Sequence, residues 1–466
     1  MSVQLRVSGG TIYLPGGPVT ADLLVDGEKV VGIVDRDTPV ADVATVLDAT
    51  GKVVLPGMVD VHVHTREPGL THKEDIYTTT LQAAAGGVTT IFGMPNLIPP
   101  TNSVQTLREV FDLYAEKSIV DYNHNPAATV ADELVPMAAM GINAFKVYMV
   151  VDTGRTYPHP AGTGMHSHGD LLKTMDIIAT TGKRFIIHPH DQSLMDYIEG
   201  EYLRRGENTP QGYASAYAAR SGVIWDTAID VVLRLAEASG CPLHLAHIQT
   251  ARSVAAIRRA KARGVDVTCE VNHWLPFLST WEDVERLGPY ALSYWVPDEG
   301  REAVWEGLRD GTIDMFSSDH APHTREEKEV GWEKMWSSHT GTPGIQYYYP
   351  LALDAVNQGK LTLDRVVELV AWAPSRKFGL AGKKGALIPG HDADFVIADM
   401  GAEWTISNDD VLSKCGWTCY DGRKVSAGIE TTYVRGAEVF ANGKVTGKPG
   451  QGKLASKSAT MSEVSI

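Results

Sequence analysis

Residues 59–64 read Val-Asp-Val-His-Val-His, an apolar run that ends in two histidines. Side chains two positions apart on a β-strand project to the same face, so His62 and His64 can bind one metal ion together. Four more residues of types found at metal sites each end a separate predicted strand further along the chain: Lys146, His188, His247 and Asp319. Six such groups at strand ends indicate one assembled metal centre.

The middle of the chain alternates strand-like and helix-like segments, which is typical of a parallel sheet covered by helices. We count eight candidate strands, near 59–64, 88–93, 120–124, 143–148, 184–189, 242–248, 265–271 and 313–319. Eight strand–helix units predict an α/β fold of the (β/α)8 TIM barrel type, whose active site lies at the carboxyl ends of the strands. His64, Lys146, His188, His247 and Asp319 fall at such ends, so the fold and the chemistry agree.

Both ends of the chain consist of short apolar runs separated by turns. In residues 1–55, Asp26-Gly27 joins two such runs and predicts a β-hairpin. The same texture returns after residue 385. We therefore expect a small β-sandwich domain from 1–55 plus 385–450, a metal-binding barrel domain at 56–384, and a C-terminal tail at 451–466.

Composition narrows the class of protein. The chain has 466 residues, 43% of them hydrophobic, and a net charge of −15, so it can bury a large core and does not resemble a nucleic-acid-binding protein. We find no signal-peptide pattern and no apolar stretch near the about 18 residues of a membrane span, so we expect a cytoplasmic protein. The four cysteines (Cys241, Cys269, Cys415, Cys419) are too scattered for a disulfide framework, and free thiols are expected rather than a structural zinc site.

Histidine nitrogens and carboxylate oxygens suit zinc and similar divalent ions. A single histidine on an apolar strand is more often a core residue, but six groups in register favour a metal-dependent hydrolase. Lys146 differs because a protonated amine cannot coordinate a cation. Between the apolar Phe145 and Val147 its pKa should fall, which would free a neutral amine for covalent chemistry; a buried salt bridge is an equal alternative.

Five stretches together resemble one known family. They are LPGMVDVHVHTREPGLTHKEDI at 55–76 with AAAGGVTTIFGMPNLIPP at 83–100, Ala144-Phe145-Lys146, His244-Leu245-Ala246-His247, SSDHAPHTREEK at 317–328, and GALIPGHDADFVIAD at 385–399. These motifs closely resemble the dihydroorotase, hydantoinase and allantoinase branch of the amidohydrolase superfamily, and they span nearly the whole chain.

The resemblance implies a centre of two divalent ions, with zinc as the first choice and Mn, Co or Fe as alternatives. In that family the lysine is carboxylated; here His62, His64, the Lys146 carbamate and Asp319 would hold one ion. His188, His247 and the same carbamate would hold the other. A metal-bridging hydroxide would open a cyclic amide, imide or ureide ring, with Asp319 as general acid/base. Relatives are commonly homo-oligomers, dimers or tetramers.

Three residues match dihydroorotase positions that hold a substrate carboxylate: Arg66, Asn96 and His323. If the strand stays extended, Arg66 lies on the side of the histidine pair. A salt bridge of Arg66 to Glu67 or Glu74, and a turn-capping role for Asn96, are the structural alternatives.

Other positions depart from the family patterns. His188 is followed by Pro189-His190-Asp191, residues 293–297 replace the usual pyrimidine-contacting loop, and Val151 stands where hydantoinases have a tyrosine. The substrate therefore stays open between dihydroorotate, hydantoin, dihydropyrimidine, allantoin and other imides.

Further alternatives concern the loops and the class of reaction. The segment 152–168, with three histidines, is either a surface insertion or a further metal site, and His190 either orients a ligand or only packs. Five tryptophans in barrel connections either line a pocket or pack beneath loops: Trp225, Trp274, Trp295, Trp332 and Trp336. A lactonase or phosphotriesterase on the same centre is the alternative function, and a non-catalytic scaffold related to hydantoinases is a third.

Overall fold

A ring of eight parallel strands forms the centre of the computed structural model, which describes residues 3–150, 160–291 and 298–456. The strands are β8 (Met58–Val63), β9 (Val88–Gly93), β10 (Asp121–His124), β11 (Ala144–Tyr148), β12 (Arg184–His188), β13 (Leu243–Leu245), β14 (Val267–Val271) and β15 (Met315–Phe316). They form two sheets, ordered β10-β9-β8 and β11-β12-β13-β14-β15. Parallel bridges from Val63 to His320 and from Ala127 to Lys146 join the sheets at both edges, so the barrel closes as predicted.

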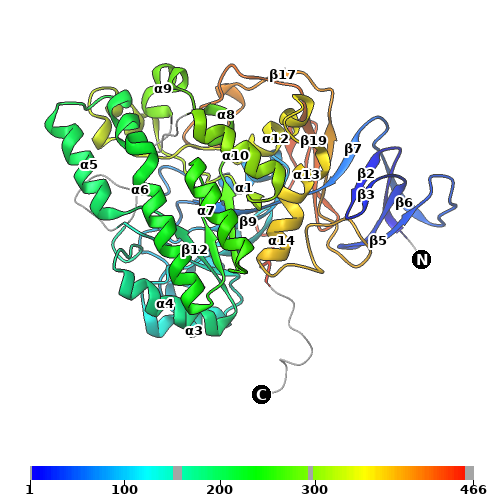
Figure 1. Cartoon of the computed structure of the whole chain (residues 1–466). Helices are drawn as coiled ribbons and strands as arrows, with labels where there is room; N and C mark the ends of the chain where they lie inside the picture. The colour runs from blue at the N-terminus through cyan, green and yellow to red at the C-terminus, as the bar shows by residue number, and fades with distance from the viewer. Residues whose placement is uncertain (1–2, 151–159, 292–297, 457–466) are drawn as a thin grey trace.

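Helices surround the strands on the outside (Figure 1). Along the chain they are α1 (Ile76–Ala85), α2 (Val104–Lys117), α3 (Ala131–Ala139), α4 (His168–Thr181), α5 (Gln192–Arg204), α6 (Pro210–Ser239), α7 (Ala251–Ala262), α8 (Trp274–Leu278), α9 (Trp281–Leu287), α10 (Asp298–Asp310), α11 (Arg325–Glu329), α12 (Tyr348–Asn357), α13 (Leu363–Val367) and α14 (Ala373–Lys377). Many begin at a side-chain cap; Asp75 and Ser103, for example, each form a capping box at the start of α1 and α2.

Two of the eight strands are much shorter than expected. β13 ends at Leu245 and β15 at Phe316, so His247 and Asp319 lie beyond their strands rather than closing them. Both residues have a positive φ, 38° and 46°, which non-glycine residues adopt only where surrounding contacts hold them. The chain thus leaves strand geometry where it presents these two side chains.

The β-rich ends of the chain form two further sheets next to the barrel. One is ordered β5-β4-β1-β6, with β1 (Val3–Ser8), β4 (Asp22–Asp26), β5 (Lys29–Val34) and β6 (Val43–Asp48). The other is ordered β21-β20-β19-β16-β7-β2-β3, with β2 (Thr11–Leu14), β3 (Gly17–Thr20), β7 (Val53–Pro56), β16 (Phe395–Asp399), β19 (Gly428–Val434), β20 (Ala437–Ala441) and β21 (Lys444–Val445). A separate pair joins β17 (Trp404–Thr405) to β18 (Lys424–Val425).

The second sheet brings the two ends of the chain together, since β7 pairs with β16, and Figure 1 shows the blue N-terminal strands beside the orange C-terminal ones. Leu23, Val54 and Phe395 share one buried cluster between the two sheets. β4 and β5 pair antiparallel across Asp26 and Lys29, which confirms the predicted hairpin. The fold is therefore a TIM barrel with a β-sandwich built from both ends.

The described part of the expected C-terminal tail is packed into the barrel. Lys453 accepts a backbone hydrogen bond from Tyr122, and Ala455 donates one to Tyr122. The carbonyl of Ala455 accepts from both Asn123 and Asn143, beside β10 and β11. Two adjoining strands thus offer polar groups that this segment satisfies, a long-range pairing that its Gly- and Lys-rich composition does not show.

A buried lysine links the barrel to the sandwich. Lys384 Nζ lies 2.6 Å from Asp121, 3.0 Å from Asp392 and 2.6 Å from Asp394, and all four side chains are almost completely buried. Although burial opposes it, the charges of Asp394 and Asp392 raise the pKa of Lys384. The cation neutralises a group of carboxylates that would otherwise repel one another.

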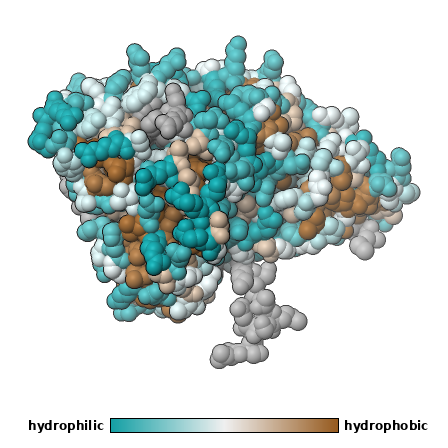
Figure 2. Space-filling model, viewed as in Figure 1, coloured by the Kyte–Doolittle hydropathy of each residue, from teal (hydrophilic) through white to brown (hydrophobic). Residues whose placement is uncertain are grey.

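The surface is mostly hydrophilic on the face shown in Figure 2, with hydrophobic side chains gathered over part of the sandwich. Val31 on β5 and Val46 on β6 are among the exposed large hydrophobic residues. Within the described residues, no helix is both long and apolar enough to cross a membrane. All four cysteines are free and buried.

Candidate metal centre

Three of the predicted ligands converge at one point. His62 Nε2 and His64 Nε2 each lie 3.2 Å from Asp319 Oδ1, and the ligand atoms of all three residues lie within 4.8 Å of one another. Both histidines and the loop after β15 reach the carboxyl end of the barrel. Burial opposes ionisation of Asp319, but the neighbouring imidazoles of His62 and His64 hold its pKa well below the usual range.

The other predicted ligands lie beside this group. His188 Nδ1 is 2.7 Å from His247 Nε2, and the ring of His247 lies 6.0 Å from that of His62. Lys146 lies on β11 with its amine 5.0 Å from the centre of the Tyr148 ring. The pKa of His247 is lowered to about 3 by burial, so the imidazole is neutral and its nitrogens can donate electron pairs to a metal.

Lys146 has the properties that covalent modification would need. It is completely buried, and its Nζ has no hydrogen-bond partner among the described residues. Burial lowers its pKa to about 8, although the charges of Glu270 and Asp319 act in the opposite direction. The salt-bridge alternative is not what the structure shows, because no carboxylate forms an ion pair with this amine in the described ranges. A buried amine without a hydrogen-bond partner in the described chain, close enough to His247 and Asp319 to interact with them electrostatically, fits a metal centre that a lysine carbamate completes.

Two residues that the sequence analysis missed support the ligands. Glu270, on β14, has its Oε1 in contact with His62 Nδ1, and its Oε2 is 3.1 Å from His244 Nε2. Asn272 follows the same strand and donates to Asp319 Oδ2 over 3.2 Å. Both carboxylate oxygens of Glu270 therefore hold imidazoles, and the Glu270–His62 contact turns His62 Nε2 toward Asp319. The sequence feature that could have identified Glu270 is the presence of a carboxylate within the apolar strand 267–271.

Asn96 lies against a ligand. Its Oδ1 is 2.6 Å from His64 Nδ1, so it accepts the ring proton there and leaves His64 Nε2 for the metal. Asn96 follows β9, the neighbour of β8, which explains the approach. Through this contact Asn96 orients the ring of His64, whether or not it also contacts substrate.

Arg66 and His323 lie together, as the shared role expected for them requires. Arg66 Nη2 is 3.1 Å from His323 Nε2, and Arg66 Nε donates to the carbonyl of Pro322 over 3.2 Å. Arg66 is not extended, however: its φ is 61°, so the chain turns away from the strand just after His64. Arg66 is completely buried, and it forms neither of the salt bridges considered above, with Glu67 or with Glu74, in the described residues.

His190 and Trp225 form one wall beside the centre. His190 Nδ1 is 3.1 Å from His188 Nε2, and the Trp225 ring meets His190 edge-on at 4.0 Å. Trp225 also lies 5.8 Å from the ring of His247. His190 is thus in a position to orient His188, and Trp225 packs behind both histidines.

The remaining loop predictions have mixed outcomes. His166 and His168 are exposed where α4 begins, and neither belongs to a group of possible metal ligands among the described residues. Trp336 packs on Tyr213 and donates to the carbonyl of Glu207, whereas Trp332 is exposed. His159, Val151 and the segment 293–297 with Trp295 lie outside the described residues.

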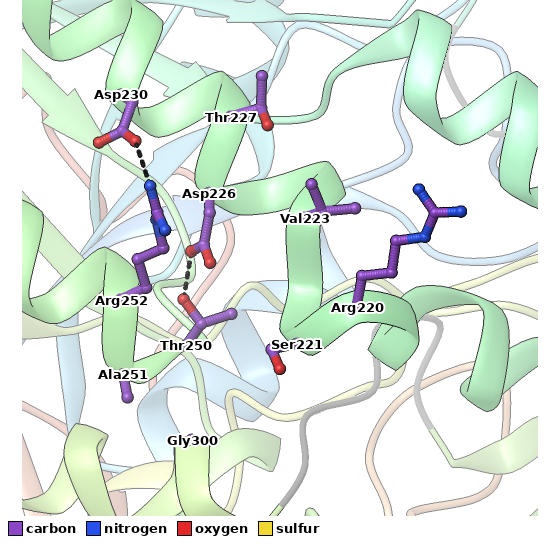
Figure 3. Close-up of a pocket in the computed structure, with 10 residues that line it drawn as sticks. All are labelled: Arg220, Ser221, Val223, Asp226, Thr227, Asp230, Thr250, Ala251, Arg252 and Gly300. Atoms are coloured by element: carbon purple, nitrogen blue, oxygen red, sulfur yellow. Dashed lines mark hydrogen bonds and ion pairs between the residues drawn. The ribbon is translucent and has the colours of Figure 1, made fainter.

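A separate pocket of about 450 Å³ lies between α6 and the start of α7 (Figure 3). Its charges largely cancel: Arg252 lies 3.5 Å from Asp230, and Asp226 accepts a hydrogen bond from Thr250. Beside it α6 is interrupted, with Arg220, Ser221 and Gly222 all at positive φ. The residues that line the pocket include none of the metal-ligand candidates.

Comparison with known proteins assigns the class. The model of the amidohydrolase family matches residues 53–439, and the chain belongs to this family. The clustered histidines and aspartate, on this family's fold, form a divalent metal centre.

Individual relatives narrow the branch. The chain is 33% identical to a dihydroorotase of Methanosarcina mazei over 99% of both chains, and 30% identical to an L-hydantoinase of Paenarthrobacter aurescens over 95% of both. Its structure matches the L-hydantoinase (dihydropyrimidinase) of Arthrobacter aurescens with a TM-score of 0.92 and 29% identity, over 98% of this chain and 100% of that one. The expected dihydroorotase and hydantoinase branch is thus confirmed, and with it the class of metal-dependent hydrolases of cyclic amides.

Proposed function

We propose that the chain opens a cyclic amide, imide or ureide ring at a centre of two divalent ions, with zinc as the first choice. His62, His64, carboxylated Lys146 and Asp319 would hold one ion, and His188, His247 and the same carbamate the other. The observation that carries this proposal is the buried amine of Lys146, without a hydrogen-bond partner in the described chain, beside converging imidazoles at the carboxyl end of the barrel. Relatives named dihydroorotase and hydantoinase support the substrate class.

The chain's own residues define the proton path. Bound divalent ions would supply Lewis acidity and lower the pKa of water to about 7. The Asp319 carboxylate, ionised and fixed by Asn272, would accept the proton of the attacking water and then donate it to the departing ring nitrogen. Trp225 and His190, both buried, would exclude bulk water from one side.

Arg66, His323 and Asn96 support a substrate that carries a carboxylate. Burial lowers the pKa of Arg66 to about 10, so the guanidinium is still charged near neutral pH. Arg66 already donates from Nε to the Pro322 carbonyl and from Nη2 to His323. A carboxylate would therefore accept from Arg66 Nη1 and from the second Nη2 hydrogen. Asn96, which already holds His64, would at most add a contact from its amide nitrogen.

The test compares two rings that differ by one carboxylate. Turnover of L-dihydroorotate and of dihydrouracil would be measured on one zinc-loaded, bicarbonate-treated preparation, for the unaltered chain and for Arg66→Met. We expect the substitution to raise KM for dihydroorotate by about 10-fold or more, since a charged hydrogen bond contributes about 1.5–3 kcal/mol, and to spare dihydrouracil. Equal losses on both rings would refute the carboxylate site, and failure of a metal-loaded enzyme on every cyclic amide would refute the function.

Three further assignments belong to this proposal. The domains would be a sandwich of 1–55 plus 385–450, a metal-binding barrel of 56–384 and a segment 451–466. The protein would be cytoplasmic, and it would assemble as a homo-oligomer, a dimer or tetramer. Gel filtration with light scattering tests the last point directly.

A further inference from the structure

A second charged group lies beside His323, at the ring nitrogen that Arg66 does not contact. Glu327, on α11, has its Oε1 2.8 Å from Lys73 Nζ and its Oε2 3.3 Å from His323 Nδ1. Lys73 Nζ is also 3.1 Å from His323 Nδ1. His323 and Lys73 are buried and Glu327 is mostly so. The ring of His323 thus stands between Arg66 on one nitrogen and the Lys73–Glu327 pair on the other.

The hydrogen-bond chemistry of these groups determines the tautomer of His323. A guanidinium can only donate, so the contact with Arg66 Nη2 requires a lone pair on His323 Nε2. The proton of a neutral imidazole then lies on Nδ1 and needs an acceptor. Burial opposes ionisation of Glu327, but hydrogen bonds from His323 and Lys73 hold its pKa well below the usual range, so it is that acceptor.

Lys73 favours the opposite tautomer. Burial lowers its pKa to about 8, yet it is still mostly protonated at neutral pH and can donate to His323 Nδ1. Such a bond would place the ring proton on Nε2, where it would face the Arg66 N–H groups, donor against donor. Glu327 prevents this because it accepts from both Lys73 and His323. Its backbone is fixed by a capping box in which Glu327 Oε2 also accepts from the amide of Thr324.

We propose that Glu327 is a positioning residue that accepts from His323 Nδ1 and from Lys73, and so keeps His323 Nε2 as an acceptor for Arg66. The Arg66 guanidinium is thereby presented to an anionic substituent of the substrate ring. The inference rests on the proposed function and deepens it. It adds a residue that touches no substrate but determines the preference for anionic rings. The proposal includes no covalent step, because Glu327 keeps the ring proton of His323 on Nδ1.

The test uses the metal-loaded full chain and two probe ligands. Orotate carries the carboxylate on an unsaturated ring that is not hydrolysed, and uracil is the neutral probe without the carboxylate. Calorimetry would measure both Kd values for Glu327→Gln and for the control Glu326→Gln, which removes the same charge from an exposed neighbour on α11. We expect Glu327→Gln to weaken orotate binding by about 10–100-fold, the range for one charge-assisted hydrogen bond. Uracil binding, kcat on dihydrouracil and the Glu326→Gln variant should be unchanged.

Removal of the competing donor should rescue the variant. Adding Lys73→Met to Glu327→Gln leaves the glutamine oxygen to accept from His323 Nδ1, so we expect most of the orotate affinity to return. No rescue, or equal losses on orotate and uracil, would overturn the tautomer argument. If Glu327→Gln does not fold, Lys73→Met alone decides: unchanged orotate affinity supports the proposal, and a loss as large as that of Arg66→Met overturns it.

The proposed function and this inference fail in different ways. If Arg66→Met leaves the orotate Kd unchanged, the carboxylate site itself is wrong. If Arg66→Met weakens orotate binding but Glu327→Gln does not, only the positioning role is wrong.

Discussion

Replacing Glu270 should weaken metal binding although this residue is not one of the predicted ligands. Its Oε1 contacts His62 Nδ1 and its Oε2 lies 3.1 Å from His244, whose own Nδ1 is 2.8 Å from Thr268 Oγ1. Burial opposes ionisation, but the charge of His62 and hydrogen bonds from both histidines hold the Glu270 pKa well below the usual range. The carboxylate therefore fixes His62 with Nε2 toward Asp319, the other proposed ligand.

The geometry allows the size of the effect to be worked out for two substitutions. In Glu270→Gln the amide oxygen can still accept from His62, and its NH2 can donate to His244 if that ring donates to Thr268. Only the charge is lost, so we expect the lower end of the range for partners of metal-bound histidines, about 10-fold in metal affinity or about 1.4 kcal/mol. Glu270→Leu removes the acceptor altogether and should reach about 100-fold.

The assay is a competition between the metal-free protein and a zinc chelator of known affinity, with bound metal measured in the same samples. Thr268→Val is the matched control, because it removes the outer hydrogen bond to His244 and keeps the contact between Glu270 and His62. Zinc affinities of both Glu270 variants equal to that of the unaltered chain would refute the reasoning. So would a loss in Thr268→Val as large as that in Glu270→Leu.

Three other substitutions probe the remaining groups. Lys146→Ala should abolish tight binding of two ions, and the unaltered chain treated with ¹³C-bicarbonate should show a carbamate carbon signal in NMR that this variant lacks; a variant that keeps both ions and full turnover would contradict the carbamate. Asp319→Asn should lower kcat by about 100-fold or more, as the loss of a general acid/base does, while a mild effect in a protein with full metal content would place the base elsewhere. Lys384→Met should cost about 3–5 kcal/mol of folding free energy, because it leaves Asp394 buried without its cation and leaves Asp121 paired with Arg435 alone. In that variant the carboxyl pKa values are raised by burial in the folded state, so this destabilisation should shrink as the pH falls from 8 to 5; thermal unfolding that shows the same deficit at both pH values would contradict it.

The barrel and the positions of the candidate ligands at its carboxyl end could be predicted because their signals are local. The alternation in residues 59–64 places His62 and His64, and the predicted strands 88–93 and 184–189 differ from β9 and β12 by at most one residue at either end. A strand is buried on both faces at the centre of a barrel, so its apolar run is visible without knowledge of its neighbours. The family motifs then assigned chemistry to the polar residues that interrupt these runs.

What only the tertiary structure decided is which distant side chains meet. Glu270 reaches His62, and Lys73 reaches His323, only because barrel closure brings the end of β8 next to the loop after β15. The left-handed turn at Arg66 likewise depends on contacts made after the chain has folded, since no local pattern favours a positive φ for arginine. Periodicity records how each residue is buried along its own element, whereas hydrogen-bond partners and tautomers depend on neighbours far away in the sequence. The sequence alone therefore determined the fold and the types of candidate ligand, and the folded barrel determined how those side chains are held.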